Sequence, residues 1–319
     1  MSQCPMHALL DFERFSHGTP RELINRLREQ HRILWETDDY SGGHWLLFRQ
    51  EDIDHVLKTP ELFTNNFSPI LDDFPPEILA EQQQSMTFMD PPEHRKYRSL
   101  VDYAFRLKQL EARKPLMRRI AEETVERVIG RGECEFVTDI AMQMPMRVIG
   151  MLLGIPEQDQ ESVRDAVDAR LRTDAGKPME YSEQGMSGEM FADYVEWRAQ
   201  HPSDDLMTEL LQAEFEDETG TVRRLTREEI LTYVNVVAGA GNETTNRLIG
   251  WAGKVLAEHP EQRRDLVRDP ALIPNAIEEL LRYESPAPYI GRYVSRDVEV
   301  RGQRIPEGSA MLFVIASAN

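Results

Sequence analysis

Hydrophobic positions recur at intervals of three and four residues over most of this chain, which is the period of an amphipathic α-helix. The segments with this period are Pro20–Glu36, Pro92–Gly130, Phe136–Leu153 and Arg227–Ala257. Patterns typical of β-strands are confined to two short regions. We therefore predict a mainly α-helical fold with a small β region, built as a single domain over residues 1–319.

The two β regions lie near opposite ends of the sequence. One is Gly43–Arg49, and the other is Arg292–Ser317, where short Val/Ile runs are interrupted by Gly302 and Pro306–Gly308. The polar stretch Ala199–Arg224 is interpreted as a surface loop, because helical patterning resumes on both sides of it. A linker between domains is the alternative.

Composition excludes some classes of function. The chain of 319 residues carries 56 acidic and 37 basic residues and a net charge of −19, which argues against a nucleic-acid partner. Cys4 and Cys134 are too few for a disulfide framework, so we expect a cytoplasmic protein. The longest apolar run, Val148–Ile155, is too short to span a bilayer, and charges replace the apolar run of a signal peptide, so no membrane association is expected.

The last long helical segment has clear start and stop signals. Thr226 and Glu229 have the spacing of a capping box, and Pro260 ends the apolar pattern. Inside it, Ala238–Thr245 holds two glycines, each costing about 1 kcal/mol relative to alanine, and a carboxylate, Glu243, that is expensive to bury. The helix is either widened there so that a ligand approaches its backbone, or it is a point where another helix packs closely.

The run Ala240-Gly241-Asn242-Glu243-Thr244-Thr245 resembles the oxygen-binding motif in the long distal helix of cytochromes P450. This resemblance implies a cytochrome P450 fold that binds haem b. Ala240 and Gly241 would form a widened turn beside the haem. Thr244 and Glu243 would be catalytic, with the Thr244 hydroxyl delivering protons during oxygen activation and Glu243 relaying them from solvent. Val237 would line the substrate pocket.

Two further segments resemble the family's haem-binding regions. His94 and Arg98 share a helical face after a Pro-Pro pair, and in the family such residues bind the haem propionates, a task suited to arginine. A solvated basic helix is the alternative. In Ser285–Arg292, the resemblance makes Arg292 a third propionate partner and places Pro288 and Ile290 in the substrate pocket.

Glu279 and Arg282 resemble the family's Glu-x-x-Arg motif. Considered alone, the two residues have the spacing of an ordinary surface ion pair on a helix. The resemblance implies instead a structural pair, buried together with a later arginine on the proximal side of the haem.

The family's glycine-rich loop, whose cysteine thiolate binds the haem iron, has no counterpart in this sequence. Only 37 residues follow Arg282, and the family loop lies several dozen residues beyond this point. Cys4 and Cys134 are interpreted as bystanders, so no metal ligand is assigned. We therefore expect an incomplete cytochrome P450 domain, truncated before the C-terminal haem-thiolate portion and inactive as written, because the thiolate favours O–O cleavage.

By resemblance, the function is that of a haem-thiolate monooxygenase that inserts one oxygen atom from O2 into a hydrophobic small molecule. Two alternatives remain. The first is a non-enzymatic, truncated or haem-free helical scaffold. The second is a haem-independent enzyme with Glu243 as its acid, which would leave His94, Arg98 and Arg292 without a role.

The resemblance also implies a ferredoxin- or flavodoxin-like electron donor. A local excess of basic residues between Glu93 and Arg119 suits an acidic donor, although a solvated helix face is the alternative. The basic residues are Arg95, Lys96, Arg98, Arg106, Lys108, Arg113, Lys114, Arg118 and Arg119.

Overall fold

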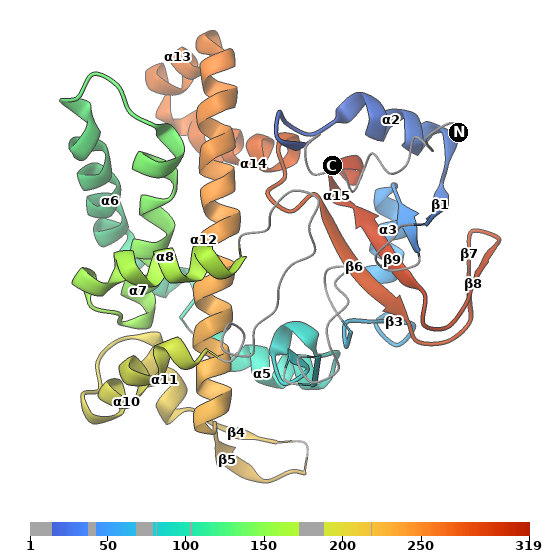
Figure 1. The fold of residues 1–319 in the computed structure, drawn as a ribbon, viewed down its shortest axis with the longest axis horizontal. Helices are drawn as coiled ribbons and strands as arrows, with labels where there is room; N and C mark the ends of the chain where they lie inside the picture. The colour runs from blue at the N-terminus through green and yellow to red at the C-terminus, as the bar shows by residue number, and fades with distance from the viewer. Residues whose placement is uncertain are drawn as a thin grey trace.

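The computed structural model describes residues 15–37, 43–67, 79–80, 82–102, 104–171, 188–217 and 219–319. Helices dominate these residues and strands form a smaller part, which confirms the predicted mainly α-helical fold class (Figure 1). The α-helices are α2 Arg21–Gln30, α3 Gln50–Leu57, α5 Glu93–Asp102, α6 Leu107–Ile129, α7 Gln143–Leu153, α8 Gln160–Leu171, α10 Ala192–Gln200, α11 Leu206–Gln212, α12 Arg227–Glu258, α13 Pro260–Arg268, α14 Ile273–Tyr283 and α15 Ile315–Ala318.

The main sheet has five strands in the order β1-β2-β9-β6-β3. Its central strand β9 pairs parallel with β2 and antiparallel with β6, and all five β9 residues are buried, which suits a continuous apolar run covered on both faces. Two separate antiparallel pairs, β4–β5 and β7–β8, complete the strands. Their bounds are β1 Ile33–Glu36, β2 His44–Leu47, β3 Phe63–Thr64, β4 Glu214–Glu216, β5 Val222–Arg224, β6 Tyr289–Val294, β7 Val298–Val300, β8 Gln303–Ile305 and β9 Ala310–Val314.

Several predicted segments divide differently in the structure. The helical pattern of Pro20–Glu36 ends at Gln30 and continues as strand β1, and Pro92–Gly130 is two helices, α5 and α6. The prediction of a surface loop at Ala199–Arg224 was wrong, because this segment contains helix α11 and the β4–β5 hairpin. Strands of two to four residues are too short to show a periodic pattern.

Apolar side chains form three clusters. The largest lies in the helical layer among α7, α8, α10, α11 and the first half of α12, and two smaller ones pack beside the main sheet. Figure 1 shows α12, in orange, between the layer that contains α6, α7 and α8 and the sheet that contains β6 and β9. Helix α12 packs mainly against helices, among them α7, α8 and α11.

The start of α12 follows from its sequence. The Glu229 amide donates to Thr226 Oγ1 over 3.2 Å, and the Thr226 amide donates to Glu229 Oε2 over 2.7 Å, so the predicted capping box is present. The helix ends at Glu258, directly before Pro260 opens α13.

None of the described helices is long and apolar enough to cross a bilayer.

Candidate haem-binding site

Three cationic or titratable side chains from distant segments approach one another beside α5. His94 and Arg98 lie one turn apart on α5, and Arg292 lies on β6. Burial lowers the pKa of His94, and the positive charges of Arg98 and Arg292 lower it further. We call His94, Arg98 and Arg292 the cationic cluster; the structure brings the three predicted residues together.

Two carboxylates, Asp90 and Asp102, lie near the cationic cluster. Asp90 is the carboxylate whose charge acts on both His94 and Arg292, and it is already engaged elsewhere. It accepts hydrogen bonds from the Thr64 hydroxyl and, over 3.0 Å, from the Asn65 amide. The guanidinium groups of Arg98 and Arg292 are nevertheless suited to an anionic ligand.

Arg292 is the most constrained member of the cationic cluster. It is half-buried, and burial lowers its pKa, which means that the surroundings oppose its charge. Its guanidinium donates to the carbonyl of the neighbouring Gly291 over 2.7 Å. An incoming carboxylate would accept a bidentate pair of charge-assisted hydrogen bonds from this side chain.

Arg98 differs from the other two members of the cationic cluster in its exposure. The Arg98 side chain is 62% exposed and lies 3.7 Å from Asp102 on the same helix, so it can turn toward a ligand at small cost. His94 is half-buried, and its lowered pKa favours the neutral imidazole, which donates one N–H without adding charge. The donor set therefore fits the two carboxylates of a haem.

The distal-helix motif, Ala240–Thr245, lies in the middle of α12, and the widened turn expected there is absent. The helix is α-helical without interruption, so Ala240 and Gly241 form no widened turn. Gly241 is instead a point of close helix packing, because a Cβ there would come within 2.3 Å of Ile149 Cδ1 on α7. Ala240 is exposed.

Glu243 is not a buried carboxylate. Its side chain is 31% exposed and forms an ion pair with Arg247 one turn later, since the helical layer covers α12 mainly up to Asn242. Thr244 is exposed, and its hydroxyl donates to the Ala240 carbonyl over 3.1 Å. This partner is local, and the hydroxyl oxygen keeps its capacity to accept a hydrogen bond.

The three predicted pocket residues lie in different surroundings. Val237 is buried in the apolar cluster of the helical layer, whereas Ile290 packs against an apolar cluster of the sheet. Pro288 is half-buried just before β6. A cavity of about 630 Å³ beside Asp90 is bordered by other residues, among them Thr64, Phe67 and Val294, so it does not join the three.

Glu279 and Arg282 form the ion pair that their spacing predicts. Arg282 donates to both carboxylate oxygens over 2.7 Å, yet the two side chains are 56% and 51% exposed. Every residue of α14 is at least partly exposed, and Ile273 and Ile277 are exposed apolar residues of this helix. The burial that the resemblance implies is thus not provided by the described residues.

The described residues offer no thiolate to α12. Cys134 is exposed in the turn between α6 and the short π-helix at Val137–Ala141, and Cys4 lies outside the described residues. No group of three or more His, Cys, Asp or Glu side chains in the described ranges is arranged to hold a metal ion. The residues thus fit the carboxylates of a haem, but they do not supply its axial ligand.

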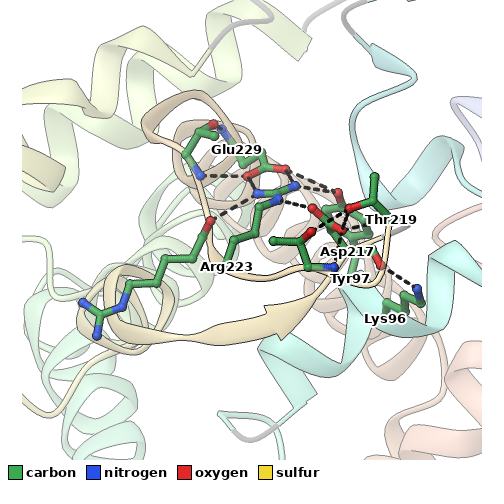
Figure 2. A network of polar contacts seen from close by, with 9 residues as sticks. Lys96, Tyr97, Asp217, Thr219, Arg223 and Glu229 are labelled. Atoms are coloured by element: carbon green, nitrogen blue, oxygen red, sulfur yellow. Dashed lines mark hydrogen bonds and ion pairs between the residues drawn. The ribbon is translucent and has the colours of Figure 1, made fainter.

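A second polar network beside α5 was missed from the sequence. Figure 2 shows Arg223 of β5 between Asp217 and Glu229, with Tyr97 and Lys96 of α5 close by. Hydrogen bonds from Thr219 and Thr221, with one from Arg223, lower the pKa of Asp217 to about 2. The capping box of Thr226 and Glu229 is the one part of this network that the sequence predicted.

Comparison with known proteins identifies similar chains and a matching family model. The family model of cytochrome P450 matches residues 142–319. Cytochrome P450 CYP107DY1 of Priestia megaterium is 32% identical over 312 residues, covering 92% of this chain and 75% of that protein. Vitamin D(3) 25-hydroxylase of Pseudonocardia autotrophica is 32% identical over 281 residues, covering 87% and 68%.

A solved structure extends the similarity to three dimensions. Mycobacterium marinum cytochrome P450 CYP268A2, in complex with pseudoionone, superposes with a TM-score of 0.82 at 28% identity and covers 94% of this chain and 76% of that one. Members of this family bind haem b and act as monooxygenases. With a family model matching more than half of its residues and relatives matching most of its length, this chain belongs to the cytochrome P450 family.

Proposed function

We propose that this chain is the haem-propionate and oxygen-side portion of a monooxygenase that oxidises an apolar small molecule. The observation that carries the proposal is the cationic cluster, because Arg98 and Arg292, from α5 and β6, both lie near enough to His94 for their charges to act on it. Haem carries two carboxylates and is the cofactor of the family. When bound with a thiolate ligand, it supplies the oxygen-activating chemistry.

Arg292 and Arg98 bind the propionates by charge-assisted hydrogen bonds, and the neutral His94 ring donates a further N–H. Arg292 gains most from this contact, because a carboxylate relieves the cost of a desolvated guanidinium. These three side chains would hold the haem through its carboxylates. Cys134 takes no part, since it lies exposed after α6.

Thr244 and Glu243 carry out proton transfer from solvent during oxygen activation. The Thr244 hydroxyl donates to the Ala240 carbonyl and accepts a second hydrogen bond at Oγ1, so it can pass a proton inward. Glu243 takes protons from solvent, because its carboxylate is partly exposed and pairs with the exposed Arg247 one turn later. A carboxylate that changes protonation state suits this general-acid role.

The substrate is a small apolar molecule. Pro288 and Ile290, at the start of β6, offer half-buried apolar surface, and the proposed pocket also includes Val237, whose side chain is buried in the helical layer. Two similar proteins favour the same class, since one is a vitamin D(3) 25-hydroxylase and the other is bound to pseudoionone.

The electron donor is an acidic ferredoxin- or flavodoxin-like protein that docks on α5 and α6. Seven cations there are exposed, and we call them the basic surface: Arg95, Arg98, Arg106, Lys108, Lys114, Arg118 and Arg119. Lys96 and Arg113 are half-buried and do not belong to it. Exposed charge of one sign accelerates encounter with a partner of opposite sign.

Iron-free protoporphyrin IX tests the carboxylate contacts without an axial ligand. Its affinity for the 319-residue chain is measured by fluorescence, with the dimethyl ester as a ligand that lacks carboxylates. We expect Arg292→Met to weaken protoporphyrin binding about tenfold or more, because a hydrogen bond to a charged group contributes roughly 1.5–3 kcal/mol. The ester should bind wild type and variant equally.

Arg268→Gln on α13 is the matched control, since it removes one arginine charge from an exposed helix. It should leave both affinities unchanged. Equal protoporphyrin affinity of wild type and Arg292→Met would overturn the assignment of the cationic cluster.

A further inference from the structure

The β4–β5 hairpin reaches across from α12 to the helix that carries His94 and Arg98. Its two short strands pair Glu214 with Arg224 and Glu216 with Val222. The Asp217 carboxylate accepts from the Thr219 amide over 2.9 Å, and Gly220 has a φ of +81°, which favours glycine. These contacts give the hairpin a defined shape.

Arg223 joins this hairpin to the first turn of α12. Its Nη1 and Nη2 donate to the two Glu229 oxygens over 2.7 and 2.8 Å, and its Nε donates to Asp217 Oδ2 over 3.2 Å. The hydrogen bonds with Glu229 raise the pKa of Arg223. Burial opposes the charge of Glu229, but hydrogen bonds from Arg223 and the Thr226 amide outweigh it and hold the pKa of Glu229 below its ordinary value.

The same group of residues contacts α5 at several points (Figure 2). Lys96 Nζ donates to the Asp217 carbonyl over 3.1 Å, and the Tyr97 hydroxyl lies 3.3 Å from Glu229 Oε1 and 3.4 Å from Arg223 Nη2. The Tyr97 ring packs edge-on against Phe215, with 5.4 Å between ring centroids.

A contact from α12 itself completes the connection. The buried Tyr233 hydroxyl donates to the Tyr97 carbonyl over 2.7 Å. Lys96 and Tyr97 thus connect α5 to both the hairpin and α12, and they lie between His94 and Arg98 in the sequence. Any shift of α5 at Tyr97 would move His94 and Arg98, the two members of the cationic cluster that lie on this helix.

We infer that Asp217, Arg223 and Glu229 form a clasp that fixes α5 against α12, and that Arg223 is the positioning residue that sets His94 and Arg98 opposite Arg292. Arg223 touches none of the three, so it acts through Tyr97 and Lys96. The consequence for haem orientation rests on the proposed function, but the geometric inference does not.

The pKa of His94 reports on this geometry. It is lowered by burial and by Arg98, Arg292 and Arg95, and Asp90 acts in the opposite direction. If α5 moves away from β6, burial and the influence of Arg292 both fall, and the pKa rises toward its ordinary value near 6.5. The position of α5 can therefore be followed without any bound ligand.

The experiment is an NMR titration of the His94 imidazole in the full chain, with its resonance assigned from His94→Gln. We expect Arg223→Met to raise the pKa of His94, and Arg223→Lys to raise it less, because lysine keeps the charge but lacks the bidentate fork. Arg224→Met is the matched control, since Arg224 lies next in the same strand and pairs with exposed Glu214. It should leave the pKa of His94 unchanged.

Tyr97→Phe provides a second, milder variant if Arg223→Met does not fold. It keeps the ring against Phe215 and removes the hydroxyl contacts, so the pKa of His94 should rise in the same direction. A folded Arg223→Met or Tyr97→Phe protein with the wild-type pKa of His94 would overturn the inference. If the wild-type chain does not bind protoporphyrin at the cationic cluster, the proposed function alone is refuted, because the titration involves no porphyrin.

Discussion

Two groups of charged side chains contact the same helix and behave in opposite ways. In the clasp, Arg223 faces two carboxylates and its pKa is raised, mainly by its hydrogen bonds with Glu229. In the cationic cluster, burial lowers the pKa of Arg292, and nearby Asp90 only partly offsets this effect. The comparison shows that charge balance separates an arginine used for structure from one available to a ligand.

The difference follows from the hydrogen-bond partners that each arginine already has. Arg223 directs three guanidinium hydrogen bonds to carboxylates. Arg292 donates to a neighbouring backbone carbonyl, and Asp90 is held by Thr64 and Asn65. A desolvated cation without a carboxylate is costly to the fold, and a bound anion would relieve that cost.

The largest expected effect is on stability, and the two arginines should differ in its sign. Arg223→Met should lower the free energy of unfolding by about 2–3 kcal/mol, because it leaves Glu229 half-buried without its main partner. Arg292→Met should leave it unchanged or raise it, because methionine removes a desolvated charge. Urea unfolding followed by circular dichroism measures both. Equal losses in the two variants would abolish the distinction between clasp and cationic cluster.

Sequence reasoning identified one of these groups and missed the other, for a physical reason. His94 and Arg98 are one helical turn apart, so their shared face follows from spacing alone. Arg292 was added only through the family resemblance. The clasp depends on β4 and β5, whose three-residue strands have no recognisable period, and on a tertiary contact between Arg223 and Tyr97.

The same limit applies to the fold. The long helix α12 was predicted closely, since capping and proline signals are local. The β region Arg292–Ser317 was also predicted, and it contains β6 and the central strand β9 of the main sheet. The surroundings of Glu243 were not, because neighbouring apolar residues indicate burial only if another element covers that face. In the described residues the cover ends near Asn242.

A smaller effect is expected at the basic surface, which differs from the clasp because its charges are exposed. Replacing Lys108, Arg118 and Arg119 with glutamate should slow association with an acidic ferredoxin about tenfold at low salt, and the difference should fade near 0.5 M salt, where roughly a 4 Å screening length applies. Biolayer interferometry at several salt concentrations measures the association rate. Triple replacement of Arg263, Arg264 and Arg268 on α13 controls for net charge. If both triple variants slow association equally, the basic surface has no specific role.

The smallest expected effect concerns Glu279 and Arg282, which have the bidentate geometry of the clasp without its burial. Both side chains are more than half exposed, so solvent screens the pair. Glu279→Ala and Arg282→Ala should each change the free energy of unfolding by only about 0.5 kcal/mol or less, the range of exposed helix pairs, despite two hydrogen bonds of 2.7 Å. Urea unfolding measures the free energy of unfolding of both variants and of Arg223→Met under the same conditions. A loss as large as that of Arg223→Met would mean that α14 is covered in solution by something beyond the described residues, because hydrogen-bond geometry alone does not give an exposed pair such strength.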